Sequence, residues 1–142
     1  MGCIVVVDLS GRACILIPLK EEISIYRYKA GLLGVHPIMR SVMHSLRAIQ
    51  AARMSVKELS SRMEKLGYEQ VLVLPYHEIS SIELKKPPLL APTIIITAYN
   101  RRHVYRIAFG PGTGMSKNEA FENARDLLCS IPQLNQKIVV KS

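Results

Sequence analysis

The sequence predicts a single α+β domain, built on a bent antiparallel sheet of about seven strands. Three observations favour this fold class. Short apolar runs follow one another at tight spacing through residues 3–28 and again through 70–109. Residues 35–67, between these two blocks, repeat apolar side chains at helical spacing. A capped amphipathic pattern follows the last strand, so we expect a C-terminal helix over 116–130 that closes one end of the sheet.

Size and composition fit one soluble domain. The chain has 142 residues, 49% of them hydrophobic, which is typical of a globular protein. No apolar run approaches the roughly 20 residues that a membrane helix needs, and no signal peptide is recognisable, so we expect a cytoplasmic protein. The domain divides into four parts: strands over 1–30, a helical insertion over 35–67, strands and the closing helix over 70–131, and a tail over 132–142.

The first predicted hairpin, residues 3–9 and 12–18, is apolar on both faces. With a two-residue turn at Ser10-Gly11, Val7 would pair with Cys14. This register sorts the apolar side chains into two faces: Val5, Val7, Cys14 and Leu16 on one, and Ile4, Val6, Ile15 and Ile17 on the other. A hairpin with one solvated face would alternate apolar with polar residues. We therefore expect a cover over the second face, either the chain's own helices or another subunit, and this favours a homodimer.

A third strand is predicted over 23–28, and two helices follow it. Pro37 suits the first position of a helix whose apolar residues are Ile38, Val42, Leu46 and Ile49. Ser55 and Glu58 form a capping box for a second helix, which Gly67 ends. Its apolar face consists of Val56, Leu59, Met63 and Leu66.

The strands resume at Gln70. Runs over 71–74 and 79–84 precede the loop KKPPLLAP, and a hairpin over 93–99 and 102–109 turns at Asn100-Arg101. That turn sorts the side chains into an inner face with Ile94, Ile96, Ala98, His103, Tyr105 and Ile107, and an outer face with Thr97, Tyr99, Arg102, Val104 and Arg106. Ser116 and Glu119 then cap the last helix. Its buried stripe is Ala120, Phe121, Ala124, Leu127, Leu128 and Ile131.

The segment LPYHEISSIELKK, followed by an alternating hairpin and a closing helix, resembles the pleckstrin-homology-like superfold in its bacterial and archaeal versions. The resemblance covers about residues 68–131. It implies a bent barrel of about seven strands that a C-terminal helix plugs at one end. The superfold's lipid-binding members hold phosphoinositides through basic residues in the loop between the first two strands. That loop here offers only Arg12, so phosphoinositide binding is not supported.

Basic residues supply the main candidate surface. Lys and Arg outnumber Asp and Glu by 19 to 11, giving a formal net charge of +8. Half of this excess lies in 35–67, where Arg40, His44 and Arg47 share one side of the first predicted helix. Arg101, Arg102 and Arg106 gather at the tip and outer face of the second hairpin. Both groups suit an acidic partner, and both also suit an ordinary solvated surface.

The glycine-rich stretch GPGTGMSK lies between a strand and a helix, where phosphate loops occur. It does not match the phosphate-loop pattern, because Met115, Ser116 and Lys117 replace the required glycine, lysine and hydroxyl residue. Backbone amides at a capped helix start can still hold an anion. The residues of this weaker candidate are Gly112, Gly114, Ser116 and Lys117.

No catalytic, cofactor or metal motif is recognisable, so we expect no enzyme activity, no cofactor and no metal. The four histidines lie on different elements, and Cys3 and Cys14 are too far out of register to form a disulfide. These observations favour a non-catalytic interaction module that presents a basic helical face to an acidic macromolecule. The alternative is a nucleic-acid-binding protein that uses the same basic residues.

Overall fold

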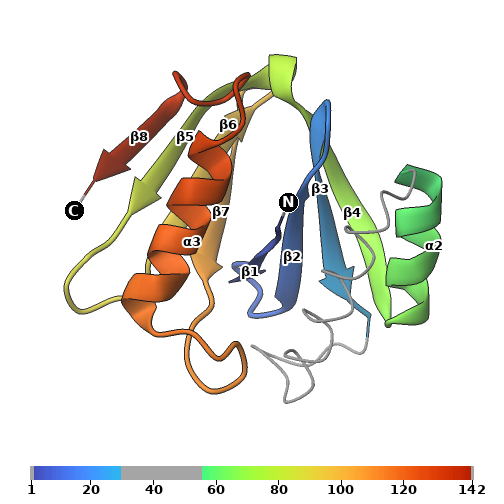
Figure 1. Ribbon diagram of the computed structural model, residues 1–142, viewed down its shortest axis with the longest axis horizontal. Coiled ribbons are helices and arrows are strands. Elements are labelled where there is room, and N and C mark those ends of the chain that lie inside the picture. The colour runs from blue at the N-terminus through green and yellow to red at the C-terminus, as the bar shows by residue number, and fades with distance from the viewer. Residues whose placement is uncertain (1, 30–55, 142) are drawn as a thin grey trace.

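A computed structural model describes residues 2–29 and 56–141 of the chain. Its strands are β1 (Ile4–Val7), β2 (Ala13–Pro18), β3 (Glu22–Tyr28), β4 (Tyr68–Pro75), β5 (Ile79–Lys85), β6 (Thr93–Ala98), β7 (Arg101–Ile107) and β8 (Ile138–Lys141). Its helices are α2 (Val56–Lys65), α3 (Lys117–Cys129) and the short 3-10 helix η1 (Tyr76–Glu78). The strands lie in the order β4-β3-β2-β1-β7-β6-β5-β8, as Figure 1 shows. Neither described α-helix is long and apolar enough to cross a bilayer.

The expected α+β class is confirmed, and two details of the sheet were wrong. The described residues contain an eighth strand, β8, which lies parallel to β5 and makes the sheet mixed. This strand comes from the tail over 132–142, which was not among the seven strands predicted from the sequence. The sheet is also not closed into a barrel. Its edge strands are β4 and β8, and β8 occupies the side of β5 that closure onto β4 would need.

The first hairpin has a different register from the expected one, and this changes its faces. Ile4 pairs with Leu16 and Val6 with Cys14, one residue away from the expected pairing. The cause is a three-residue loop instead of a two-residue turn. Asp8 N donates to Arg12 O at 3.0 Å, and Gly11 has a φ of 87°, the left-handed conformation that such loops require. Ile4 and Val6 therefore share a face with Cys14 and Leu16.

Each face of this hairpin belongs to a different hydrophobic cluster of the same chain. One face, with Ile4 and Leu16, joins the large core that α3 covers through Phe121 and Leu128 (Figure 1). The other face joins the second core, whose members are Cys3, Val5, Ala13, Ile15, Ile17, Tyr26, Leu59, Met63, Tyr68 and Ala108. Leu59 and Met63 come from α2. Because both faces are buried within one chain, the apolar surface that suggested a homodimer is not free.

The capping box predicted for α3 and the glycine stop predicted for α2 are confirmed, while Ser55, the predicted cap of α2, lies outside the described residues. Ser116 caps α3, and its hydroxyl accepts from Glu119 N at 3.2 Å in a complete capping box. Gly67 ends the α2 segment with a φ of 90°. The expected apolar faces are confirmed for the buried residues Leu59 and Met63, and for the stripe of α3. The first inserted helix, with Pro37, lies outside the described residues.

The second hairpin keeps its predicted faces although its turn is displaced. The turn residues are Tyr99 and Asn100, with φ values of 53° and 60°, instead of Asn100-Arg101. Ile96 consequently pairs with His103 rather than with Tyr105. This slip moves the pairing by two residues, and two residues is the period of a strand. Every side chain therefore stays on its expected face.

Replacing Asp8 with alanine tests what holds the first hairpin in register. The Asp8 carboxylate accepts from Ser10 N, Ser10 Oγ and Arg12 N at 2.9, 2.6 and 3.0 Å. We expect Asp8→Ala to lower the free energy of unfolding by about 1–2 kcal/mol at pH 7, measured by urea denaturation. Asp126→Ala, at the exposed aspartate of α3, is the control and should change it by less than about 0.5 kcal/mol.

The same comparison has a defined pH dependence. Burial by itself raises the pKa of Asp8, but the hydrogen bonds from Ser10 and Arg12, together with Arg27, outweigh it and lower the pKa below its ordinary value. A carboxyl group with a lowered pKa stabilises the fold above its unfolded pKa of about 4, and this contribution is lost in acid. The difference between wild type and Asp8→Ala should therefore shrink as the pH falls below about 4. A difference independent of pH would contradict this role.

Candidate functional site

The outer face of the half-sheet β7-β6-β5-β8 carries a cluster of cations, which we call the basic sheet face. Its residues are Lys85, Arg102, Arg106 and Lys141, and Glu83 lies among them. The register explains the cluster. Lys141 pairs with Lys85, Lys85 with Thr93, and Thr93 with Arg106, so one row runs across four strands. The alternate residues Leu84, Ile94 and Tyr105 face the large core, which turns this row outward.

Glu83 is the acidic residue of this face and is shared among three of its cations. Its carboxylate oxygens lie 3.4 Å from Lys141 Nζ, 3.8 Å from Lys85 Nζ and 4.0 Å from Arg102 Nη2. One carboxylate cannot neutralise these cations and Arg106 as well. The cations also stay accessible, because the side chains of Arg102 and Lys141 are 63% and 53% exposed. The face therefore keeps a net positive charge that a ligand can reach.

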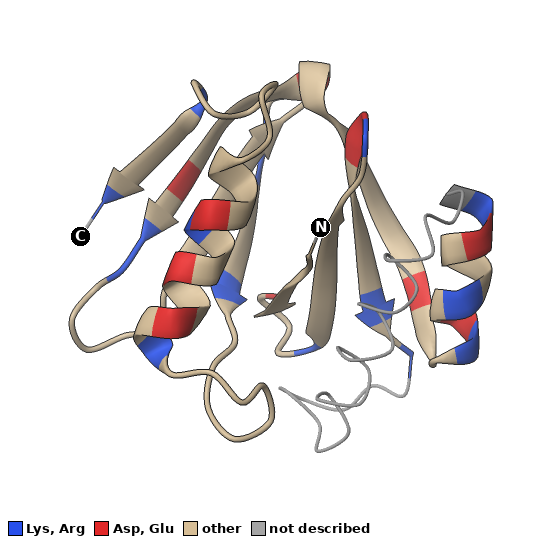
Figure 2. Ribbon diagram, in the orientation of Figure 1, with Lys and Arg blue, Asp and Glu red and all other residues tan. Residues whose placement is uncertain are grey.

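The opposite side of this half of the molecule is acidic. Helix α3 covers the inner face of the sheet and turns Glu119, Glu122 and Asp126 to solvent. Figure 2 shows these acidic residues along α3, while lysine and arginine residues mark the strands β5, β7 and β8. Arg125 Nη2 lies 3.3 Å from Asp126 Oδ1, so the helix's own arginine is partly neutralised. In this half of the molecule, the cations of the sheet and the acidic residues of α3 thus lie on opposite sides.

The structure brings together some of the residues predicted from the sequence and separates others. Arg102 and Arg106 lie on one face, as expected. Arg101 pairs with Ala98 and alternates with Arg102, so it lies on the inner side with His103. Arg40, His44 and Arg47 lie outside the described residues. Lys85, Lys141 and Glu83 were missed, although the alternation in IELK carried a signal for the strand that holds Lys85 and Glu83.

The glycine-rich loop uses several of its backbone amides internally. Gly110 N donates to Met115 O at 2.7 Å, and Gly114 N donates to Gly110 O at 2.9 Å. Ser116 N donates to a carboxylate oxygen of Glu119 at 3.3 Å. Gly112 lies within this turn, and Gly114 has a φ of 72°. An anion at this loop would have to compete with these internal acceptors for the backbone amides.

Lys117, the cation predicted beside that loop, is bound elsewhere. Its Nζ donates to Pro87 O at 2.7 Å and to Pro88 O at 3.2 Å. The ammonium group thereby ties the first turn of α3 to the loop between β5 and β6. These two hydrogen bonds give Lys117 a structural role.

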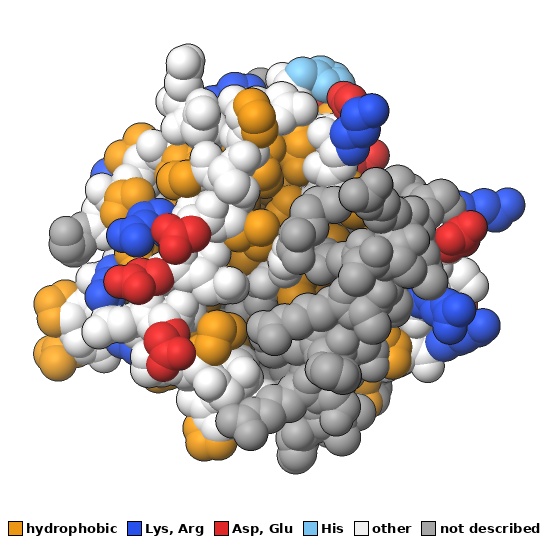
Figure 3. Space-filling view, viewed as in Figure 1, with side chains coloured by type: hydrophobic (Ala, Val, Ile, Leu, Met, Phe, Trp, Pro, Cys, Tyr) orange, Lys and Arg blue, Asp and Glu red, His pale blue; other side chains and the backbone are white. Residues whose placement is uncertain are grey.

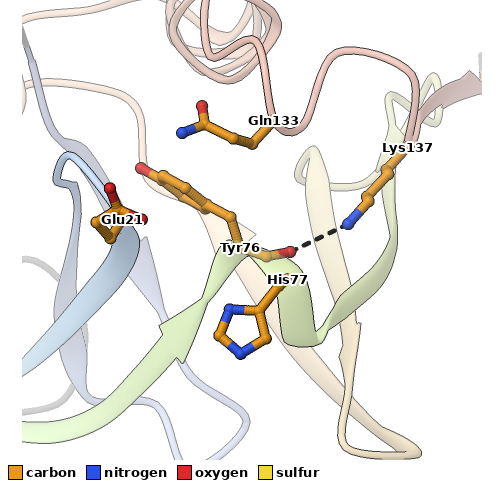
Figure 4. Close-up of a pocket in the computed structure, with 5 residues that line it drawn as sticks. All are labelled: Glu21, Tyr76, His77, Gln133 and Lys137. Atoms are coloured by element: carbon orange, nitrogen blue, oxygen red, sulfur yellow. Dashed lines mark hydrogen bonds between the residues drawn. The ribbon is translucent and has the colours of Figure 1, made fainter.

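A hollow of about 270 Å³ lies where η1 meets the segment that leads into β8. Figure 4 shows its lining residues, Glu21, Tyr76, His77, Gln133 and Lys137. Lys137 Nζ donates to Tyr76 O at 3.1 Å, and the Tyr76 hydroxyl donates to Leu19 O. Burial raises the pKa of Tyr76 to about 12, so its hydroxyl stays protonated at neutral pH. These contacts join three chain segments. The Lys137 ammonium and the Tyr76 hydroxyl already donate to backbone carbonyl groups, so a structural role explains both side chains.

A second hollow of about 260 Å³ lies between α2 and the strands β3 and β4. The hydroxyls of Tyr26 and Ser60 share a hydrogen bond of 2.9 Å there, and Gln70 Nε2 donates to Ser24 Oγ at 2.6 Å.

The buried thiol of Cys14 and the acidic side chains do not form a reactive or metal-binding cluster in the described residues. Burial raises the pKa of Cys14 to about 12, which keeps this thiol protonated. Across residues 2–29 and 56–141, no group of three or more His, Cys, Asp or Glu is placed to hold a metal ion.

Comparison of the chain with protein-family models, with curated proteins and with solved structures found no match. An open face with several cations and one shared carboxylate can attract and orient an anionic surface. It offers hydrogen-bond donors from two arginines, which bind carboxylates in a forked geometry.

His103 provides a test of the inner side of this half-sheet. Burial lowers the pKa of His103, and the neighbouring Arg101 lowers it further. A histidine with a lowered pKa favours the fold while neutral, so this contribution to stability is lost as the pH falls. In an NMR titration, Arg101→Ala should raise the pKa of His103 partway toward its ordinary value. Arg102→Ala, on the opposite face, is the control, and an equal rise there would contradict the observed register.

Proposed function

We propose that the protein is a non-catalytic interaction module that holds an acidic protein on its basic sheet face. The observation that carries this proposal is the separation of charge across the half of the domain that holds β7, β6, β5, β8 and α3. Lys85, Arg102, Arg106 and Lys141 gather on one side, and the acidic residues of α3 lie on the other. Such a distribution orients an acidic partner toward the sheet during encounter and repels it from the helix.

The choice of an acidic protein over nucleic acid follows from what surrounds the cations. The other described residues of the face are aliphatic or hydroxyl-bearing: Ser81, Thr93, Ile95, Thr97, Val104 and Val139. None is an aromatic side chain on which a base could stack. A protein surface with several carboxylates and some apolar area matches this mixture better.

We further propose the pleckstrin-homology-like arrangement as the scaffold of this module. The antiparallel order β4-β3-β2-β1-β7-β6-β5 and a helix packed on the inner face support it. The second group of predicted basic residues, Arg40, His44 and Arg47, belongs to the insertion between β3 and β4 and lies outside the described residues. The apolar face that suggested a homodimer is buried within the chain. The homodimer therefore stays a prediction that this face no longer supports.

The proposal predicts a specific loss of affinity for an acidic polypeptide. We expect wild-type protein to bind polyglutamate at low salt and to release it as salt screens the charges. The double variant Arg102→Ala/Arg106→Ala should bind about tenfold more weakly, since each exposed ion contact contributes up to about 1 kcal/mol. The measurement is calorimetry or fluorescence anisotropy across a salt series.

Arg125→Ala is the matched control, because it removes an arginine from the acidic helix instead of the sheet. Its affinity for polyglutamate should equal that of the wild type or fall only slightly, because the variant loses one positive charge far from the basic sheet face. An equal loss in both variants would contradict a localised site, and no binding at low salt would overturn the proposed function. Tighter binding of a DNA or RNA oligonucleotide than of polyglutamate, at equal salt, would decide for the nucleic-acid alternative.

A further inference from the structure

The loop between β5 and β6, residues 86–92, presents two leucines to solvent. Leu89 is 95% exposed and Leu90 is 70% exposed, and they are adjacent in the chain. Figure 3 shows hydrophobic side chains at the edge of the molecule where Figure 1 places this loop. Two neighbouring leucines at the tip of a projecting loop contribute nothing to the core, so their exposure calls for another explanation.

The stems of this loop are fixed, although its tip is bare. Lys117 Nζ donates to the carbonyl groups of Pro87 and Pro88, and Ile107 N donates to Pro92 O at 2.8 Å. The three prolines further restrict the backbone. Leu89 and Leu90 are therefore held out from a tethered base, which lowers the entropy cost of placing them in an apolar environment.

Cations of the basic sheet face lie beside the base of this loop. β5 ends at Lys85 and β6 begins at Thr93, so the row Lys141, Lys85, Thr93 and Arg106 crosses the sheet where the loop leaves it. Lys86 follows Lys85 within the loop itself. An apolar tip with cations behind it matches the layers of a membrane surface, where anionic headgroups lie above the acyl chains.

We propose that the β5–β6 loop anchors the protein to an anionic membrane by inserting Leu89 and Leu90 among the acyl chains. Lys85, Lys141 and Arg106 then lie at the level of the headgroups. The attraction is to the general negative charge of the surface and needs no pocket for one particular headgroup. The inference goes beyond the proposed function, because Leu89 and Leu90 carry it and neither belongs to the basic sheet face.

Vesicle binding tests this inference with a built-in reporter. The chain contains no tryptophan, so Leu89→Trp introduces a single one at the loop tip. Its fluorescence should shift to the blue with phosphatidylcholine vesicles that contain phosphatidylserine, and much less with pure phosphatidylcholine. Leu9→Trp is the matched control, because Leu9 is 73% exposed in the loop between β1 and β2. No shift for Leu89→Trp, or an equal shift for Leu9→Trp, would overturn the inference.

A second pair of variants measures the affinity. Leu89→Ser/Leu90→Ser should bind the phosphatidylserine vesicles about 100-fold more weakly, taking roughly tenfold for each leucine withdrawn from an apolar layer. Leu9→Ser should bind them as the wild type does. Both variants change exposed side chains, and thermal unfolding confirms that each is folded. Equal binding by the double variant and the wild type would overturn the inference.

The two proposals fail separately. If polyglutamate binds but vesicles do not, the membrane anchor is wrong and the proposed function stands. If vesicles bind but polyglutamate does not, the proposed function is wrong and the membrane anchor stands. Leu89→Ser/Leu90→Ser should keep the wild-type affinity for polyglutamate, because neither leucine belongs to the basic sheet face.

Discussion

The constraint on which this structure depends is the burial of both faces of the first hairpin. β1 and β2 consist almost wholly of apolar residues, and strands alternate their side chains, so neither face can be left in water. Helix α3 covers one face and α2 contributes to the cover of the other. Burying Ile15 and Ile17 on one side and Leu16 on the other stabilises the fold by about 1.5–3 kcal/mol for each side chain. The remaining strands are arranged around this doubly covered centre.

Two-sided burial at the centre decides where a binding surface can lie. The half-sheet formed by β7, β6, β5 and β8 needs only one cover, because most side chains on its outer face are polar or charged. The register that sends Ile94 and Tyr105 into the core sends Arg106 and Lys85 outward. β8 completes this surface by adding Lys141 next to Lys85. The basic sheet face thus follows from strand alternation and from one extra strand. The acidic outer side of α3 lies opposite this face and makes the charge distribution asymmetric.

The sequence predicted those features that depend on local periodicity. The capping box at Ser116 and the faces of the second hairpin follow from patterns within a few residues, and the structure has them. The first hairpin shows the limit of such patterns. Asp8 binds Ser10 and Arg12 and thereby selects a three-residue loop, and a shift of one residue exchanges the faces of Ile4 and Val6. The pairing of β8 with β5 is a long-range contact, so no local signal announced Lys141 as a neighbour of Glu83.

The central claim is that the outer face of β5, β7 and β8 is where the protein meets an acidic partner. Mapping backbone amide shifts by NMR, while polyglutamate is added to labelled protein, tests this claim most directly. The account predicts that the shifts concentrate at Glu83, Arg102, Arg106 and Lys141 and their neighbours on the same face. It also predicts that amides along α3 from Glu119 to Asp126 stay in place. Shifts centred on α3, or spread evenly over the described residues, would contradict it.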